Sequence, residues 1–464
     1  MNKLRIINFL VKLNFYHFYI DFKHYFSTYL IRIIGETEIF KNKISILNPT
    51  KIDFFIDRES FGESVLDFTN TLSNIKKFIS DLNKNNMKHI NIYIIGNILN
   101  KDLDYWFHEN INSLVKNYLI EKRKINSNLF HFYLNNDKFI SLSYRKKHPF
   151  LFRKQSYINY RVGHIGSYTN RFDIFHNYKT LLNDENFITL ESICKKNFSI
   201  KIEGLIRKIL SKKIAVFYDY DIAIRKDRFS DNAKNQLKNN LYLRYLDNEI
   251  INETLNFLIK KDYNIVRLGR SRKKFPFDND NFYDLAYEYN DSIEIESFDF
   301  YFPYNSDLCI TLGSGGHSCP MLFGVPVFNV GYHRLDNLQN LRNSMIVPKK
   351  FYSSNKKALI PLSKLQKMEI YPYSKLYWDS KKIIINSPSN LEVKQSFLEF
   401  YYYLNKIKNF ADIDELKINN WQKLYLKNNY EYKKLQKSKF KHKDKFSVVV
   451  SKYEIDKYSS FYLG

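Results

Sequence analysis

One glycine-rich stretch, Asp307 to Gly331, constrains the fold of this chain more than any other part of it. Within it, Leu308 to Leu312 is an apolar run of strand length, and the four residues Gly313 to Gly316 (GSGG) interrupt that run. The residues from His317 to Phe323 then favour a short helix, after which a second apolar run begins. A strand, a glycine turn, a helix and another strand in this order predict a βα unit of an α/β domain.

The same turn has the chemistry of a phosphate-binding loop. Backbone N–H groups at the start of a helix carry partial positive charge, and Gly313, Gly315 and Gly316 let that backbone approach an anion closely. Ser314 adds a hydroxyl donor, and His317 opens the helix. The alternative is an ordinary βα turn, in which glycines are common. The phosphate hypothesis therefore depends on what surrounds the turn.

Length and composition set the broad class of the protein. A chain of 464 residues exceeds what one core holds, so we expect two domains with appendages. The net charge of +25 favours anionic partners, although the abundance of Lys and Asn is also typical of an AT-rich genome. The three cysteines (Cys194, Cys309 and Cys319) lack metal-ligand spacing, which predicts a reducing compartment. With no long apolar run and no leader cleavage site, we expect a cytoplasmic protein.

The two ends of the chain differ from its middle. The first 45 residues are aromatic and basic, which indicates either docking onto the rest of the protein or a position at a membrane interface. Residues 405–445 are again basic and aromatic, and indicate either a solvated surface or a peripheral contact with an anionic membrane. These shifts, with a weakly marked boundary in the middle, divide the chain into residues 1–45, 46–205, 206–405 and 406–464.

The third of these parts alternates between strand and helix patterns. The predicted strands are Lys213–Tyr218, Tyr263–Arg270, Ser292–Glu296 and Leu308–Leu312, and the predicted helices are Leu246–Lys261, Phe282–Tyr289 and Asn390–Leu404. Repeated βα units with short connections predict a parallel, doubly wound sheet, whose ligands bind at the carboxyl ends of the strands. Arg267, Arg270 and the glycine turn all fall at such ends. This convergence favours an anion site there.

The second part predicts another α/β domain. It contains the expected strands Ile52–Ile56 and His89–Gly96 and a helix near Leu103–Glu121, and two further strands are expected at Leu129–Leu134 and Phe139–Tyr144. Between Tyr160 and Tyr168, two glycines flank His164 beside Arg161. A loop histidine can act as a general base near neutral pH, although a solvated turn histidine explains the pattern equally well.

With these elements placed, residues 213–464 resemble a bacterial family of glycosyltransferases of the GT-B fold, found in surface-polysaccharide settings. The resemblance is carried by four segments: YLRYLDNEI at Tyr242–Ile250, VRLGR at Val266–Arg270, the Gly313–Pro320 turn with FGVPV at Phe323–Val327, and the end VSKYEIDKY at Val450–Tyr458. Heptosyltransferases are also similar in the glycine turn and in a histidine at the position of His317. The resemblance departs at Phe217–Asp221, where the family has an arginine and this chain has none.

The resemblance implies an α/β, GT-B-like architecture in which two Rossmann-like, doubly wound domains face each other across a cleft. The N-terminal domain (46–205) would hold the acceptor, with His164 as the base and Arg161 beside it. The C-terminal domain (206–405) would hold the nucleotide sugar through the residues Arg244, Arg267, Arg270, Gly313, Ser314, Gly315, Gly316 and His317. It further implies sugar transfer to a hydroxyl acceptor, a glycan or lipid-linked molecule, with neither metal nor cofactor.

Other functions remain open at this stage. Asp219 and Asp221 follow a predicted strand as Asp-X-Asp, the arrangement by which metal-dependent GT-A transferases hold a cation on the donor diphosphate. A sugar-nucleotide epimerase shares the fold, but usually has carboxylates after the glycine turn, where this chain has Ser318-Cys319-Pro320. The charge also suits a nucleic-acid-binding protein, although no known nucleic-acid motif is present, so nucleic acid is not an expected partner. The missing arginine also leaves a degenerate, non-catalytic member of the family as an alternative.

Overall fold

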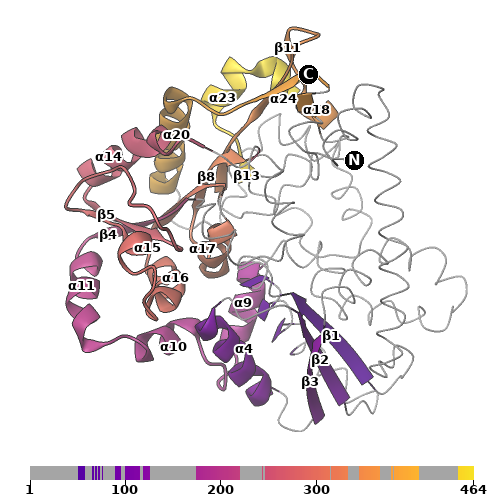
Figure 1. The fold of residues 1–464 in the computed structure, drawn as a ribbon, viewed down its shortest axis with the longest axis vertical. Helices are drawn as coiled ribbons and strands as arrows, with labels where there is room; N and C mark the ends of the chain where they lie inside the picture. The colour runs from indigo at the N-terminus through magenta and orange to yellow at the C-terminus, as the bar shows by residue number, and fades with distance from the viewer. Residues whose placement is uncertain are drawn as a thin grey trace, which may run out of the picture. The chain divides into compact units, whose positions relative to one another are not determined.

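In the computed structural model the chain forms two compact units, residues 1–189 and 190–464. Figure 1 draws the helices and strands of both units. Residues 51–57, 65–66, 68–69, 72–73, 76, 89–95, 100–114, 119–125, 174–219, 243, 246–313, 315–332, 344–365, 378–379, 381–406 and 448–463 are the part of the chain that the structure describes. The predicted strands at 129–134 and 139–144 lie outside these residues. The predicted domain boundary at 205/206 differs from the division at 189/190, because α10 (Leu190–Lys196) and α11 (Ile200–Leu210) pack within the second unit.

The first unit contains a parallel sheet of β1 (Lys51–Asp57), β2 (His89–Ile95) and β3 (Leu119–Ile125), in the order β1-β2-β3. Helix α4 (Lys101–Leu114) buries an apolar face formed by Leu103, Trp106, Phe107 and Ile111. Asn100 caps this helix, since its side-chain oxygen accepts the N–H of Leu103 at 2.8 Å. The α/β prediction is thus confirmed here, but the helix expected to reach Glu121 ends at Leu114, and Glu121 lies in β3.

Two segments of the first unit hold each other through polar contacts. The indole N–H of Trp106 in α4 donates to the carbonyl of Ile188 at 2.8 Å, and the amide of Asn110 donates to the same carbonyl at 3.0 Å. Asn110 also accepts the N–H of Ile188 at 2.9 Å. Near this point, α9 (Ile174–Leu182) places Tyr178 against Trp106, with ring centroids 6.2 Å apart. These contacts tie residues about 80 positions apart into one unit.

The second unit is built on a seven-stranded sheet with every neighbouring pair parallel. Its strands are β4 (Lys213–Tyr218), β5 (Tyr263–Leu268), β6 (Phe282–Tyr283), β7 (Leu308–Leu312), β8 (Val327–Tyr332), β9 (Ser344–Pro348) and β13 (Val448–Val449). Their order is β13-β9-β8-β7-β4-β5-β6, so that the chain runs outward from β4 in one direction and then, from β7, in the other. This is the order of a Rossmann-like, doubly wound sheet, as the sequence predicts.

Helices cover both faces of this sheet (Figure 1). The 3₁₀ turn η3 (Asn248–Ile251), α14 (Asn252–Lys260) and α20 (Asn390–Lys406) pack on one face, where Phe328 of β8 lies 5.1 Å from Phe397 between ring centroids. Helices α11 and α16 (Ile295–Tyr304) contact β4 and β5. The central strands are therefore buried on both faces, which explains their nearly continuous apolar sequences.

Two predictions within this unit are wrong. The segment Ser292–Glu296 was expected to be a strand because Ile and Glu alternate in it, but Ile295 begins α16. This helix buries four aromatic side chains, those of Phe298, Phe300, Tyr301 and Phe302, and their burial overrides the short alternation. The segment Phe282–Tyr289 was expected to be one helix. Its first two residues instead form β6 and pair with β5, and the helix α15 spans only Leu285–Glu288.

The end of the chain packs on the second unit beside a small antiparallel sheet of β10 (Lys350–Ser353), β11 (Ala358–Leu359) and β12 (Ile383–Asn386). Helix α23 (Lys452–Lys457) is fixed by a buried ion pair in which Lys350 Nζ lies 2.6 Å from Glu454 Oε2. Tyr462, in α24 (Ser459–Leu463), donates its hydroxyl to the same oxygen at 2.8 Å. None of the helices in the described part of the chain combines the length and apolar character that crossing a bilayer needs.

Candidate functional site

The reversal of strand order in the second unit defines one point on its sheet. Strands β4 and β7 are neighbours in the sheet. Beyond β4 the sheet continues with β5 and β6, and beyond β7 it continues on the other side with β8, β9 and β13. The register pairs Tyr218, the last residue of β4, with Leu268 of β5 and with Thr311 of β7. The carboxyl ends of three strands therefore meet at one edge. In doubly wound sheets, ligands bind outside this edge, at the point of reversal.

Two glycine turns leave this edge. Gly269 follows β5 with φ +90, and Gly313 follows β7 with φ +63, both in the left-handed region that favours glycine. After Gly313, residues Gly315–His317 form the 3₁₀ turn η4 and Ser318–Phe323 form helix α17. The predicted strand, glycine turn and short helix are confirmed, and they lie at the point of reversal. The turn thus presents backbone at the edge where a doubly wound sheet receives its ligand.

Tyr218 lies beneath these turns. Its side chain is buried, and its ring occupies the space beside Gly316. Burial raises the pKa of Tyr218 well above its usual value, and the nearby Cys319 and Asp299 raise it further, so its hydroxyl stays protonated. The hydroxyl lies 3.4 Å from the carbonyl oxygen of Asp299 in α16, and the carboxylate of Asp299 accepts the N–H of Gly269 at 3.0 Å. One aromatic side chain is therefore linked to both turns.

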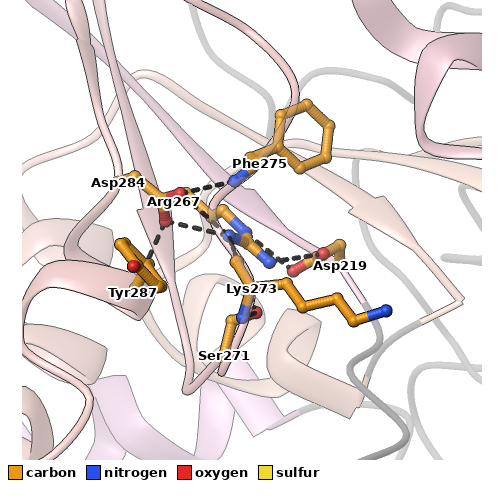
Figure 2. Close-up of polar contacts among 7 residues, drawn as sticks. All are labelled: Asp219, Arg267, Ser271, Lys273, Phe275, Asp284 and Tyr287. Atoms are coloured by element: carbon orange, nitrogen blue, oxygen red, sulfur yellow. Dashed lines mark hydrogen bonds and ion pairs between the residues drawn. The ribbon is translucent and has the colours of Figure 1, made fainter.

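Arg267 of β5 is the centre of a buried ionic cluster at the same end of the sheet, and Figure 2 shows its guanidinium between two carboxylates. Its Nε and Nη2 donate to the two oxygens of Asp219 at 3.0 and 2.7 Å. Its Nη1 donates to both oxygens of Asp284, at 2.9 and 3.0 Å, and to the carbonyl of Lys273 at 2.9 Å. The cluster thereby joins the end of β4, the strand β5, the following loop and the start of α15.

The cluster is almost fully enclosed. The side chains of Arg267, Asp219 and Asp284 are 2%, 8% and 3% exposed, so their charges have little access to water. Burial by itself lowers the pKa of Arg267, but the two carboxylates outweigh that effect and the net pKa is raised. The arginine therefore stays charged at any ordinary pH. Asp284 also accepts the N–H groups of Phe275 at 2.8 Å and of Tyr287 at 3.3 Å, as Figure 2 shows.

This placement changes what can be expected of Arg267. The resemblance implies that Arg267 or Arg270 contacts a diphosphate directly, whereas in the structure the guanidinium of Arg267 is enclosed by two carboxylates and a backbone carbonyl. A direct contact with a diphosphate would require the guanidinium of Arg267 to give up its hydrogen bonds to one of these partners. The geometry instead fits a residue that holds strand ends in place. Arg270 is more accessible, at 26% exposed, and its Nη2 donates to Glu296 at 2.9 Å.

The remaining predicted site residues have mixed outcomes. Gly313, Gly316 and His317 lie at the point of reversal, and Gly315 is described there by its backbone alone. Arg161, His164, Arg244, Ser314 and Asp221 lie outside the described residues, so their predicted roles stay predictions.

Sequence reasoning missed three residues that organise this edge: Tyr218, Asp284 and Asp299. Asp284 directly follows β6, so its position after a strand could have indicated it. Asp299 lies within the aromatic helix α16, and its contact with Gly269 depends on tertiary packing.

Comparisons with known proteins give similarity to solved structures alone, since no protein-family profile and no curated protein matches the sequence. The chain is similar to a glycosyl transferase family 9 structure from Veillonella parvula DSM 2008, at 12% identity and TM-score 0.35, covering 78% of this chain and 100% of that one. It is similar to ADP-heptose lps heptosyltransferase II of E. coli, at 9% identity and TM-score 0.31, covering 64% and 90%.

A third similar structure, from Listeria monocytogenes, is named as a UDP-N-acetylglucosamine 2-epimerase. Its identity to this chain is 8%, with a TM-score of 0.29 and coverage of 78% of this chain and 98% of that one. Similarities with TM-scores of 0.29 to 0.35 are too low to assign a function to this chain.

Proposed function

We propose that this chain is a glycosyltransferase that takes a nucleotide sugar and moves its sugar to a hydroxyl acceptor. The observation that carries this proposal is the reversal of strand order between β4 and β7, with the Gly313–His317 turn at that point. A glycine turn at this edge suits a diphosphate, because bare backbone amides can approach its oxygens closely. The resemblance of residues 213–464 to glycosyltransferases of surface-polysaccharide synthesis supports a glycan or lipid-linked acceptor.

In this proposal the second unit binds the leaving group. The acceptor oxygen bonds to the anomeric carbon, the bond from that carbon to the diphosphate breaks, and the nucleoside diphosphate leaves with the electron pair. Amides of Gly315 and Gly316 and the hydroxyl of Ser314 would donate to the negative charge that grows there. The partly exposed Arg270 would add a cation if it exchanged Glu296 for phosphate. Arg267 would act indirectly, by fixing the strand ends.

The acceptor proton needs a base, for which we propose His164 of the first unit, with Arg161 as an acceptor contact. Arg244 and His317 would complete the donor site. We propose no resident metal or cofactor, because the cationic and amide donors already named can balance the diphosphate charge. We also propose that basic residues of the two chain ends make a peripheral contact with an anionic membrane.

One observation bears on the metal-dependent alternative. Both carboxylate oxygens of Asp219 accept hydrogen bonds from Arg267, so a divalent cation at Asp219 would have to displace a buried guanidinium. Loss of turnover on addition of EDTA would nevertheless favour that alternative. An epimerase is distinguished by its product, because it interconverts the sugar on the nucleotide without releasing a nucleoside diphosphate.

Ligand-induced thermal stabilisation tests the proposed binding. A ligand that binds only the native state stabilises it by about 2.7 kcal/mol at a concentration 100 times its Kd. We expect one class in a panel of UDP, GDP and ADP sugars to raise the melting temperature of the full chain, whereas CMP sugars, which carry no diphosphate, should not. Gly315→Asp should abolish this increase, because a carboxylate in the turn repels the diphosphate.

Gly204→Asp is the matched control, since Gly204 lies in α11 with nothing within 4 Å of an added Cβ atom. It introduces the same charge away from the turn, so it should keep the increase. If no nucleotide sugar stabilises the protein, the proposed function fails. If Gly315→Asp responds like wild type, the turn is not the binding site.

A further inference from the structure

We propose that Tyr218 is a positioning residue whose aromatic ring sets the placement of the two glycine turns and so determines the affinity for the diphosphate. This inference rests on the proposed function and assigns that site a residue that makes no contact with the ligand itself. Tyr218 ends β4 at the point where the strand order reverses, and its side chain is 1% exposed. It is therefore a buried support beneath the turn.

The contact with Gly316 is unusually close. A Cβ atom added to Gly316 would lie 2.3, 2.6 and 2.7 Å from three carbons of the Tyr218 ring, distances that real Cβ atoms essentially never show. Gly316 does not share the positive φ of Gly313 and Gly269, so glycine is needed at 316 for space and not for backbone conformation. The ring and the turn backbone are thus in direct contact, and moving one moves the other.

The same ring approaches the second turn. A Cβ atom on Gly269 would lie 3.8 Å from Tyr218 Cδ1, an ordinary van der Waals distance. The ring therefore lies between the turn that follows β5 and the turn that follows β7. Because protein interiors are close-packed, removing the ring leaves a gap into which either turn can shift.

The hydroxyl of Tyr218 contributes less than the ring. Its distance of 3.4 Å to the carbonyl oxygen of Asp299 is long for a hydrogen bond between two oxygens. The contact of Asp299 with the N–H of Gly269 is shorter, at 3.0 Å, and does not need the hydroxyl. Loss of the ring should therefore weaken ligand binding far more than loss of the hydroxyl.

Calorimetric titration with the nucleotide sugar that the panel identifies tests this inference on the full chain. Losing one hydrogen bond to a charged phosphate weakens binding about tenfold, so Tyr218→Leu should raise Kd by about that factor or more. Tyr218→Phe keeps the ring and should stay within about threefold of wild type, which is half a decade in Kd. Phe397→Leu is the control, because Phe397 is equally buried but lies in α20, where its ring packs against Phe257 and Phe328. It should leave Kd unchanged.

A second measurement does not need the ligand. Gly316→Ala should destabilise the wild-type protein, and should destabilise the Tyr218→Leu variant much less, because the atoms that a Cβ would meet are those of the ring. Equal losses in the two backgrounds would overturn the inference. Equal Kd values for wild type and Tyr218→Leu would overturn it while leaving the proposed function standing. Failure of every nucleotide sugar to bind wild type would remove both, even if the Gly316 measurement gave the expected coupling.

Discussion

Replacing Arg267 by methionine tests the ionic cluster at the carboxyl end of the sheet. The change removes the cation between Asp219 and Asp284 and keeps a long, unbranched side chain. Both carboxylates are then left with little access to water, at 8% and 3% exposed. Removing one partner of a buried ion pair costs about 3–5 kcal/mol, because the remaining charge is uncompensated. Native domains are stable by only about 5–15 kcal/mol, so the loss should be large.

The two carboxylates should not contribute equally to this loss. Asp284 keeps the N–H groups of Phe275 and Tyr287 as donors, whereas both hydrogen bonds resolved for Asp219 come from Arg267. Most of the cost should therefore arise at Asp219. Combining Arg267→Met with Asp219→Asn replaces that buried charge by a neutral amide, and should recover part of the loss, because an uncompensated buried charge costs more than an unsatisfied neutral polar group.

Urea denaturation followed by circular dichroism measures these differences, with the free energy of unfolding taken from midpoints at unchanged slope. Because the chain has two units, the relevant transition is the one that the Arg267 change shifts. Arg207→Met is the matched control: Arg207 pairs with Glu203 at 3.0 Å, but the two side chains are 80% and 52% exposed. Such a pair contributes about 0–1 kcal/mol. If Arg267→Met costs no more than Arg207→Met, the account of the buried cluster is refuted.

Two further changes test local physics in the second unit. Burial lowers the pKa of Lys349 to about 8, below the value of about 10.4 in the unfolded chain. Between these two pH values the unfolded state binds more protons than the folded state. The free energy of unfolding therefore rises with pH over this range, by up to about 3 kcal/mol. Lys349→Met should remove that increase in urea titrations from pH 7.5 to 10, and an unchanged increase would contradict the assignment. Gly331→Ala should cost about 1–3 kcal/mol, because Gly331 has φ +71 and an added Cβ would lie 2.4 Å from Leu246. Gly204→Ala in the exposed part of α11 should instead gain about 0.5–1 kcal/mol, and thermal melts in which both variants shift the same way would be inconsistent with this explanation.

The sequence alone determined the elements that begin and end at strong local signals. Strand β7 spans Leu308–Leu312 and β4 spans Lys213–Tyr218, as predicted, because each is a short apolar run with clear ends. The glycine turn after β7 was found for the same reason. Where the signal was weak, as in the alternation of Ser292–Glu296, burial of the following aromatic residues decided on a helix instead.

The tertiary structure alone decided which side chains meet at the edge of the sheet. The sequence places Arg267 correctly at a strand end. Its partners Asp219 and Asp284 lie 48 and 17 residues away in sequence, and the residues around Arg267 do not predict these contacts. The close contact between Tyr218 and Gly316 likewise exists only because β4 and β7 are neighbours. Helix, strand and turn propensities act over a few neighbouring residues. Which side chain contacts a buried charge or ring depends instead on which strands are neighbours in the sheet. Strand order is fixed only when the whole sheet has formed.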